Sequence, residues 1–207
     1  MPFSAQQLSQ VVINEWDRWG TYPGTPNLKS QHLESQAKLS PIVHQYWQSI
    51  GADLDGTSPY AWSAAFICFC IKQIGYTGHD FPLKSYHSEY CAYIYAGKYP
   101  KFSLLDPELT PVQVGDIICK RRPDANGNYH EPLTYYSAIS FYNNILVDDN
   151  NNFDSHSDIV IEVNDGTILT VGGNVSDAVA SSTYDLTSNG GLNMNDAPFL
   201  AIIRINS

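Results

Sequence analysis

The segment AWSAAFICFCIKQIG, residues 61–75, is apolar on almost every side of a helix and stops at Gly75. A helix without a polar face must be enclosed by other elements, because its apolar surface would otherwise stay in water. The sequence therefore predicts a central, buried helix with the rest of the chain built around it. Hydrophobic residues make up 43% of the 207 residues, which is enough for such a core.

Three further segments show the spacing of amphipathic helices. Residues 4–19 repeat apolar side chains every three or four positions before Gly20, and a second helix is predicted over about Gln36 to Ile50. The segment HSEYCAYIYAGK, which starts at His87, reads as a further helix. All of the predicted helices lie in the first half of the chain.

After Pro111 the sequence changes to short β-branched and aromatic runs separated by Asn, Asp and Gly. Five strands are predicted: VGDIICK, TYYSAISFY, DIVIEV, TILTVGG and FLAIIRI. Asn164, Asp165 and Gly166 predict a hairpin between the third and fourth of them. The stretches KRRPDANGNYHEP and NNILVDDNNNFDS read as surface loops.

This order predicts an α+β fold in which N-terminal helices pack on a mostly antiparallel sheet of about five strands. We expect one domain over residues 1–207. Its parts would be N-terminal helices at 1–50, central helices at 61–98 and the sheet at 112–207.

The charge balance narrows the possible partners. Lys and Arg number 11 against 21 Asp and Glu, a formal net charge of -10. A nucleic-acid partner is disfavoured because phosphate binding needs a basic surface. The negative net charge would suit a cationic or neutral substrate. Alternatively, it serves only to keep the protein soluble. No apolar run is long enough for a membrane span, and MPFSAQQLSQVVINEW lacks the basic start of a Sec signal, so we expect synthesis as a soluble cytoplasmic product.

Cysteine and histidine spacings do not indicate a metal site. Cys68, Cys70, Cys91 and Cys119 match no zinc ribbon, so buried free thiols are predicted. The pairs His79-Asp80, His87-Glu89 and His156-Asp158 offer nitrogen and oxygen ligands without an HExxH pattern. We therefore expect neither a metal nor a cofactor.

Ser63 is the candidate nucleophile because it lies at the start of the buried helix, after a turn-rich loop. The first turn of a helix carries N–H groups without helical partners and a partial positive charge, which stabilise an oxyanion. The competing interpretation is that Ser63 only caps this helix, as serine often does.

His156, in DSHSDIVIEV, is the candidate base, and Asn174, in TVGGNVSDAV, is the candidate residue that orients it. The predicted hairpin would bring Asn174 near His156. Their competing interpretations are a surface histidine in a polar loop and a turn asparagine after two glycines. Asp158 is an alternative orienting residue, although at two residues from His156 on one strand we expect it to reach the ring only with difficulty.

These segments resemble papain-like cell-wall hydrolases of the CHAP and NlpC type. AWSAAFICF resembles their PWCAAFVSW-type segment, VGDIICK their PGDIV strand, SHSDIVIEV their GHVGIVV strand and GGNVSDAV their EGNTSDAV segment. The chain is more similar still to an uncharacterised bacterial branch with WSAAFIS, HSDYI, GDLIC, SHCDIVV and IGGNVSDSV. The likeness runs from about Trp47 to Arg204, and it is least specific between Pro123 and Asp154.

The resemblance implies a papain-like fold and a peptidoglycan amidase or endopeptidase lineage. Position by position, it places Ser63 as nucleophile, His156 as base and Asn174 as orienting residue. Some proteins of this kind are antibacterial effectors of type VI secretion. Such a role would imply action in the periplasm of a target cell. Its partners would be a secretion apparatus and a cognate immunity protein.

One residue departs from the family pattern, because the wider superfamily uses cysteine where this chain has Ser63. A serine hydroxyl needs stronger activation by a base than a thiol does. The chain could therefore be a serine-dependent amidase, a catalytically inactive binding module, or a serine esterase or acyltransferase, although it has no G-x-S-x-G motif. Cys91 is the nearest thiol that could replace Ser63, and it reads as a buried helix residue.

Two residues beside the nucleophile are candidates for substrate contact. His87 matches the branch pattern and would either line the cleft or cap its own helix. Trp62 would either contact substrate or pack in the core, and packing is the usual role of a tryptophan in such an apolar segment.

Overall fold

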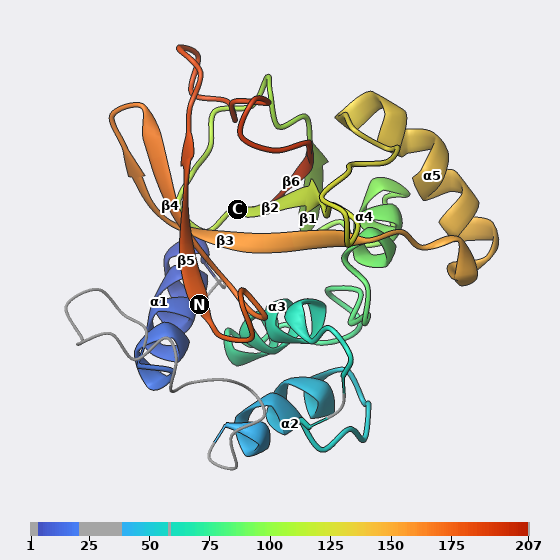
Figure 1. Ribbon diagram of the computed structural model, residues 1–207, viewed down its shortest axis with the longest axis vertical. Coiled ribbons are helices and arrows are strands. Elements are labelled where there is room, and N and C mark those ends of the chain that lie inside the picture. Colours follow the sequence, from blue (N-terminus) through green and yellow to red (C-terminus); the bar gives the residue numbers. More distant parts are fainter. Residues whose placement is uncertain (1–3, 21–38, 58, 207) are drawn as a thin grey trace.

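The computed structural model describes residues 4–20, 39–57 and 59–206. Helices lie beside and below one twisted sheet, and the long strand β3 crosses the centre of the molecule (Figure 1). The elements in chain order are α1 (Ala5–Arg18), α2 (Ser40–Ser49), α3 (Ser63–Gln73), α4 (His87–Tyr95), β1 (Phe102–Leu105), β2 (Ile117–Arg121), α5 (Tyr135–Val147), a 3₁₀ turn η2 (Asp149–Asn151), β3 (Ser155–Asn164), β4 (Thr167–Gly172), β5 (Ala180–Asp185) and β6 (Phe199–Ile205).

The sheet is antiparallel throughout, with the strand order β1-β6-β2-β3-β4-β5. The predicted hairpin is confirmed: Asn164 pairs with Thr167, and Gly166 takes a φ of +81° that only glycine adopts without strain. The predicted α+β class with helices packed on an antiparallel sheet is therefore correct.

The two faces of the sheet bury different sets of side chains. Ile117, Ile159 and Val171 belong to the large core shared with the helices, whereas their neighbours Ile118 and Val160 belong to a smaller cluster on the opposite face. This division follows from the alternation of side chains along a strand. Both faces are apolar because helices cover one of them and the segments that carry Val112 and Leu192 cover the other.

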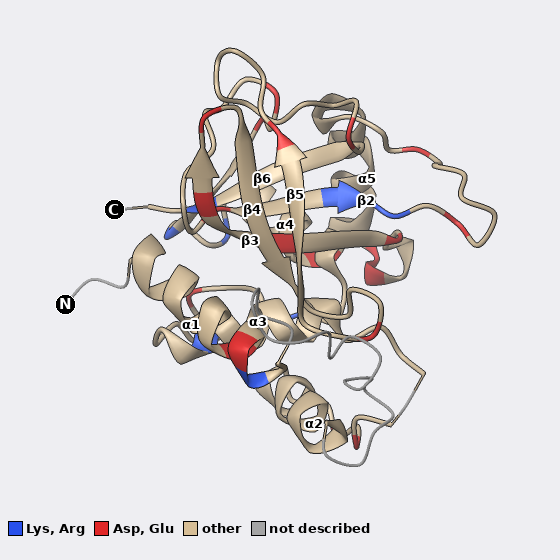
Figure 2. Cartoon of the chain, turned by 60° about the vertical axis from the view of Figure 1, so that its left-hand side comes forward, with Lys and Arg blue, Asp and Glu red and all other residues tan. Residues whose placement is uncertain are grey.

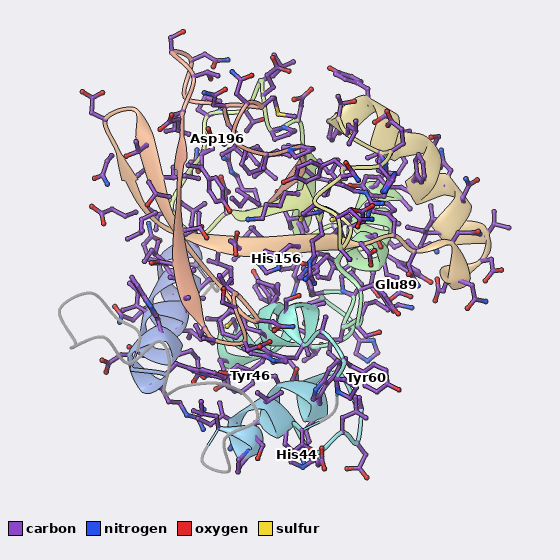
Figure 3. The ribbon with its side chains drawn as sticks, in the orientation of Figure 1. His44, Tyr46, Tyr60, Glu89, His156 and Asp196 are labelled. Carbon is purple, nitrogen blue, oxygen red and sulfur yellow. The ribbon has the colours of Figure 1, made fainter. Side chains whose placement is uncertain are left out.

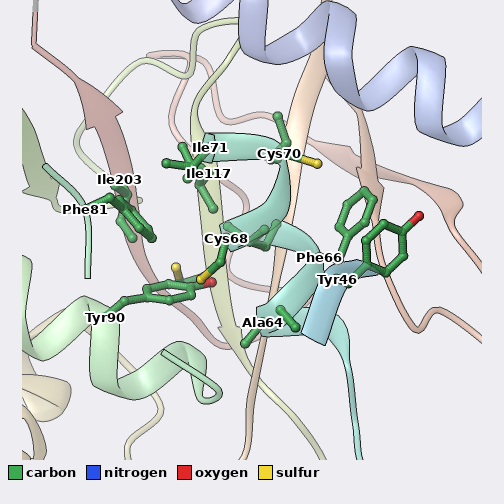
Figure 4. Close-up of a cluster of buried hydrophobic side chains, with 14 of the residues drawn as sticks. Tyr46, Ala64, Phe66, Cys68, Cys70, Ile71, Phe81, Tyr90, Ile117 and Ile203 are labelled. Atoms are coloured by element: carbon green, nitrogen blue, oxygen red, sulfur yellow. The ribbon is translucent and has the colours of Figure 1, made fainter. Parts of the chain in front are cut away.

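Helix α3 is the most enclosed helix, as its composition predicts. Nearly all its residues are buried, from Ser63 to Ile71, and it packs against α1, α2, β3 and β4. Figure 4 shows Phe66, Cys68 and Cys70 pointing from this helix into different parts of the core. All four cysteines are buried free thiols, which confirms that prediction.

The prediction of a strand at TYYSAISFY is wrong, because residues 135–147 form α5. Thr134 and Ser137 form a capping box, in which each side chain binds the other residue's backbone N–H. Ala138, Tyr142 and Ile145 are buried at helical spacing. The aromatic and β-branched content suggested a strand, but the local cap and the three-to-four residue spacing favour a helix.

Smaller differences concern the ends of elements and two strands. The predicted loop at NNILVDDNNNFDS instead supplies the last turns of α5 and the turn η2, while β1 and β5 were not predicted. β5 reads Ala-Ser-Ser-Thr-Tyr-Asp, without the apolar run that marks a central strand, and it lies at the edge of the sheet. The predicted start of the second helix at Gln36 lies outside the described residues. Within the described ranges, no helix has both the length and the apolar character needed to cross a membrane.

The capping box makes α5 testable on its own. Replacement of Thr134 by alanine removes the side chain that accepts the Ser137 N–H and should lower the free energy of unfolding by about 1 kcal/mol. Urea denaturation followed by circular dichroism measures the change. Asn143→Ala, at an exposed position inside the same helix, should not destabilise the protein. Equal effects of the two substitutions would contradict the capping role.

Candidate functional site

Ser63 and His87 meet at the starts of two helices. Ser63 is the first residue of α3 and His87 the first residue of α4, and the Ser63 Oγ lies 2.6 Å from the His87 Nε2. The N-cap residues are Trp62 and Tyr86, and neither helix has a side-chain cap. The Ser63 hydroxyl is thus bound to an imidazole 24 residues away in sequence. It does not cap its own helix.

The His87 ring is held on its second nitrogen as well. Its Nδ1 lies 2.5 Å from the Tyr90 hydroxyl, one helical turn further along α4. His87 is only 4% exposed. Burial, reinforced by the nearby His156, holds the pKa of His87 well below its usual value. The imidazole is therefore neutral at neutral pH, which is the form that accepts a proton.

His156, the base predicted from the sequence, lies beside this pair, but the described hydrogen bond of the Ser63 hydroxyl is to His87. His156 instead belongs to a charged network on the sheet. The ring centroids of His87 and His156 are 5.6 Å apart. The His156 Nε2 lies 2.9 Å from the Asp158 Oδ1, while the Lys120 Nζ lies 3.0 Å from the Asp158 Oδ2 and also contacts the Tyr184 hydroxyl. Burial alone would raise the pKa of Asp158, but His156 and Lys120 outweigh it and the pKa is lowered. Asp158 is therefore a buried carboxylate with compensated charge.

The expectation that Asp158 reaches His156 only with difficulty is wrong. Residues two apart on a strand share one face, and the short aspartate side chain spans the gap to the ring nitrogen. The orienting contact of His156 is therefore made by Asp158, and no hydrogen bond within the described part of the chain involves the His156 Nδ1.

Gly172 and Gly173 allow the sheet, the imidazole and α3 to approach so closely. A Cβ at Gly172 would lie 2.0 Å from the Asp158 Oδ1 and 3.0 Å from the His156 Nε2. A Cβ at Gly173 would lie 2.5 Å from the Phe66 Cβ. The glycine pair thus leaves room for a carboxylate on one side and for the first turns of α3 on the other.

Two cavities adjoin the site. The first, of about 430 Å³, is lined by Ser63 and His87 together with Trp47, Ala52, Leu54, Tyr60, Ala61, Ser85, Tyr86, Arg122, Asp154 and Ser155. The second, of about 540 Å³, includes His156 and Asn174 in its lining. Figure 3 shows His156 on the sheet above α3, with Tyr60 on the far side of that helix. The Ser63–His87 pair therefore faces a space large enough for part of a small peptide.

The other residues predicted from the sequence are distributed as follows. Asn174 lines the second cavity in a left-handed conformation, φ 59°, and the described hydrogen bonds of the His156 ring do not include it. Trp62 is fully buried, stacks on Trp19 and lines neither cavity, so it packs in the core instead of facing a ligand. Cys91 is buried with its sulfur 3.3 Å from the Cys119 sulfur, and it is not among the residues that line the Ser63 cavity.

Sequence reasoning did not identify Tyr90 or Lys120 as parts of the site. Tyr90 follows His87 by three residues on a predicted helix, a spacing that places both on one face. Lys120 pairs with His156 in the register of β2 and β3, which the sequence did not specify. Of these two residues, only Tyr90 could have been found from the sequence, through its helical spacing from His87.

Fold and site together define an α+β protein with a buried serine–histidine pair and an adjoining histidine–aspartate pair. The chain belongs to the family DUF2272, described as an uncharacterized protein conserved in bacteria, whose model matches residues 15–200. No curated protein and no solved structure shows a significant match to the chain. Among the described residues, no group of three or more His, Cys, Asp or Glu side chains is arranged to hold a metal ion.

The lowered pKa of His87 has a consequence for stability. In the unfolded chain a histidine takes up a proton below about pH 6.5, whereas buried His87 stays neutral. The unfolded state then binds more protons, so His87 reduces stability as the pH falls below that value. Between pH 6.5 and 5, the unfolding free energy of the wild type should fall more steeply than that of His87→Gln, by up to about 1.4 kcal/mol per pH unit. Parallel curves from urea titrations would contradict the neutral, buried state.

Proposed function

We propose that this protein is a serine-dependent hydrolase of amide bonds, with Ser63 as nucleophile and His87 as the base that takes its proton. The observation that carries the proposal is the 2.6 Å contact between the Ser63 Oγ and the His87 Nε2 beside a cavity. A hydroxyl becomes an effective nucleophile when a positioned base removes its proton as it attacks.

The chemistry follows in two steps. The Ser63 oxygen attacks the carbonyl carbon as its proton moves to the His87 Nε2, and the resulting intermediate expels the amine, which takes that proton from His87. Water then attacks the acyl carbon and gives a proton to the His87 Nε2, which passes it to the Ser63 oxygen as the carboxylic acid leaves and the hydroxyl is regenerated. The mechanism requires the tautomer of His87 that carries its proton on Nδ1 and donates it to the Tyr90 hydroxyl.

The start of α3 provides a place for the negative charge of the intermediate. Ser63, Ala64 and Ala65 occupy the first turn, in which the backbone N–H groups have no helical acceptor. The Phe66 N–H donates a helical hydrogen bond to the Trp62 oxygen, the carbonyl that precedes this turn. Donors fixed before reaction stabilise an oxyanion without reorganisation, and the helix dipole adds to the effect.

His156 and Asp158 form a second proton-transfer pair in this proposal. Asp158 fixes the ring by accepting a hydrogen bond from Nε2, while Nδ1 would contact the leaving group or the attacking water. The two imidazoles differ in environment, because His87 has no carboxylate partner among its described hydrogen bonds and His156 has one. The proposal therefore assigns the Ser63 proton to His87, and contact with the leaving group or the attacking water to His156.

Peptidoglycan is the proposed substrate, and a papain-like antibacterial effector is the proposed biological setting. The support is the resemblance of the segments around Ser63, His156 and Asn174 to CHAP and NlpC-type hydrolases, together with the order of nucleophile on a helix and histidine on a later strand. Delivery by type VI secretion and neutralisation by an immunity protein belong to the same proposal.

One observation favours the alternative of a catalytically inactive binding module. Ser63 is only 2% exposed, so a substrate carbonyl can reach its hydroxyl only from the cavity side. A scaffold that once used a thiol could retain this cavity for binding alone. The two functions differ in whether Ser63 reacts.

Fluorophosphonate labelling tests the nucleophile directly. We expect covalent modification of Ser63 in the wild-type protein, none in Ser63→Ala, and a rate lowered by about 10²–10⁴ in His87→Gln, because the general base is lost. Intact-protein mass spectrometry and peptide mapping give the readout. Ser140→Ala, at an exposed position on α5, should label like the wild type. An unlabelled wild-type protein would favour the binding module.

Cleavage of peptidoglycan tests the substrate. Purified sacculi treated with the wild-type protein should release new amine termini, which mass spectrometry of the soluble fragments would locate. Ser63→Ala and His156→Ala should release none, and periplasmic expression should inhibit growth only with the active protein. Activity that appears only in Ser63→Cys would indicate a retired hydrolase scaffold. If Ser63 is labelled but the sacculi are not cleaved, ester substrates become the next class to test.

A further inference from the structure

Three consecutive basic residues, Lys120, Arg121 and Arg122, lie at the end of β2 in a chain whose net charge is -10. Figure 2 shows them as a blue patch at the tip of β2 that continues into the following loop. All three line the second cavity, so a cavity with a local excess of positive charge occurs in an acidic protein. Such a placement is a feature of anion-binding sites.

The charges of this cavity are only partly neutralised. Lys120 forms an ion pair with the buried Asp158. The Arg121 guanidinium donates hydrogen bonds to the backbone carbonyls of His130 and Asp154. Among the ion pairs in the described part of the chain, none involves Arg121 or Arg122. Asp196 is the carboxylate in the lining, and it accepts a hydrogen bond from the Asp185 N–H.

The remaining lining groups are mostly neutral hydrogen-bonding groups. Tyr129, Asn174, Ser176, Ser182 and Tyr184 contribute hydroxyl and amide groups to the same cavity. Uncharged donors next to guanidinium groups are the usual surroundings of a bound carboxylate. The lining thus offers both charge and directed hydrogen bonds to an anionic group.

The second cavity adjoins the proposed reaction site. Arg122 lines both cavities, Asp154 and Ser155 line the first, and the next residue, His156, lines the second. The His156 ring is also 5.6 Å from the His87 ring, which binds Ser63. A ligand that spans the two cavities would therefore pass the Ser63–His87 pair and contact Arg122 on the way.

We infer that the second cavity is a subsite for a carboxylate of the substrate, held chiefly by Arg122 and by the neutral donors around it. This inference rests on the proposed hydrolase function and specifies its substrate class. The cleaved molecule is a peptide-like amide that carries a free carboxylate close to the scissile bond. The acidic remainder of the surface would repel such a ligand, so the basic lining directs it to this cavity.

Binding to the unreactive Ser63→Ala protein tests the subsite without any turnover. Isothermal titration calorimetry would compare a soluble peptidoglycan stem peptide with free carboxylates against the same peptide with every carboxylate converted to a carboxamide. We expect the free acid to bind at least about tenfold more tightly, and Arg122→Gln in the same background to remove most of that difference.

Matched variants separate a local contact from general charge. Lys98→Gln removes one exposed positive charge outside the cavity linings and should leave the affinity unchanged. Arg122→Lys should retain part of the preference, because it keeps the charge and loses the bidentate geometry. Thermal unfolding of each variant verifies that the fold is intact.

The outcomes also separate the subsite from the hydrolase. Absence of binding, equal affinity for the two peptides, or unchanged affinity in Arg122→Gln would overturn the carboxylate subsite even if Ser63 reacts with the fluorophosphonate. Arg122-dependent binding of the free acid by a protein whose Ser63 stays unlabelled would remove the hydrolase and leave the anion-binding cavity.

Discussion

The burial of α3 on all sides is the constraint from which the rest of the structure follows. An apolar helix with no polar face is stable only when α1, α2 and the strands β3 and β4 enclose it. Enclosure leaves its first turn as the part that meets a cavity, with Ser63 at that point. The glycines at the end of β4 complete the arrangement, because a side chain at Gly173 would collide with Phe66.

The site balances its charges in two separate ways. Asp158 remains a buried carboxylate because His156 donates a hydrogen bond to one of its oxygens and the Lys120 ammonium group donates one to the other. His87 instead has no charged partner among its described hydrogen bonds, and burial keeps it neutral. The two histidine rings lie 5.6 Å apart, yet His156 contacts a carboxylate whereas His87 contacts two hydroxyl groups.

A serine in this position places particular demands on its surroundings. A thiol ionises partly near neutrality, but a serine hydroxyl reacts only when a base takes its proton during attack. The structure has an imidazole at hydrogen-bond distance from that hydroxyl, supported in turn by the Tyr90 phenol. A cysteine in this position would depend less on such a base. The proposed chemistry of Ser63 depends on its hydrogen bond with His87.

The sequence by itself determined the features that arise from local patterns. The apolar run at 61–75, the β3–β4 hairpin and the α+β class could all be predicted, because periodicity and turn residues act over a few positions. Only the tertiary structure decided that Ser63 meets His87, that Asp158 binds His156, and that Lys120 lies across from them. Those contacts depend on strand register and on how two helix ends approach each other, and neither is encoded in any one segment. The segment at 135–147 shows the converse case, since its capping box and helical spacing were present in the sequence but were outweighed by its strand-like composition.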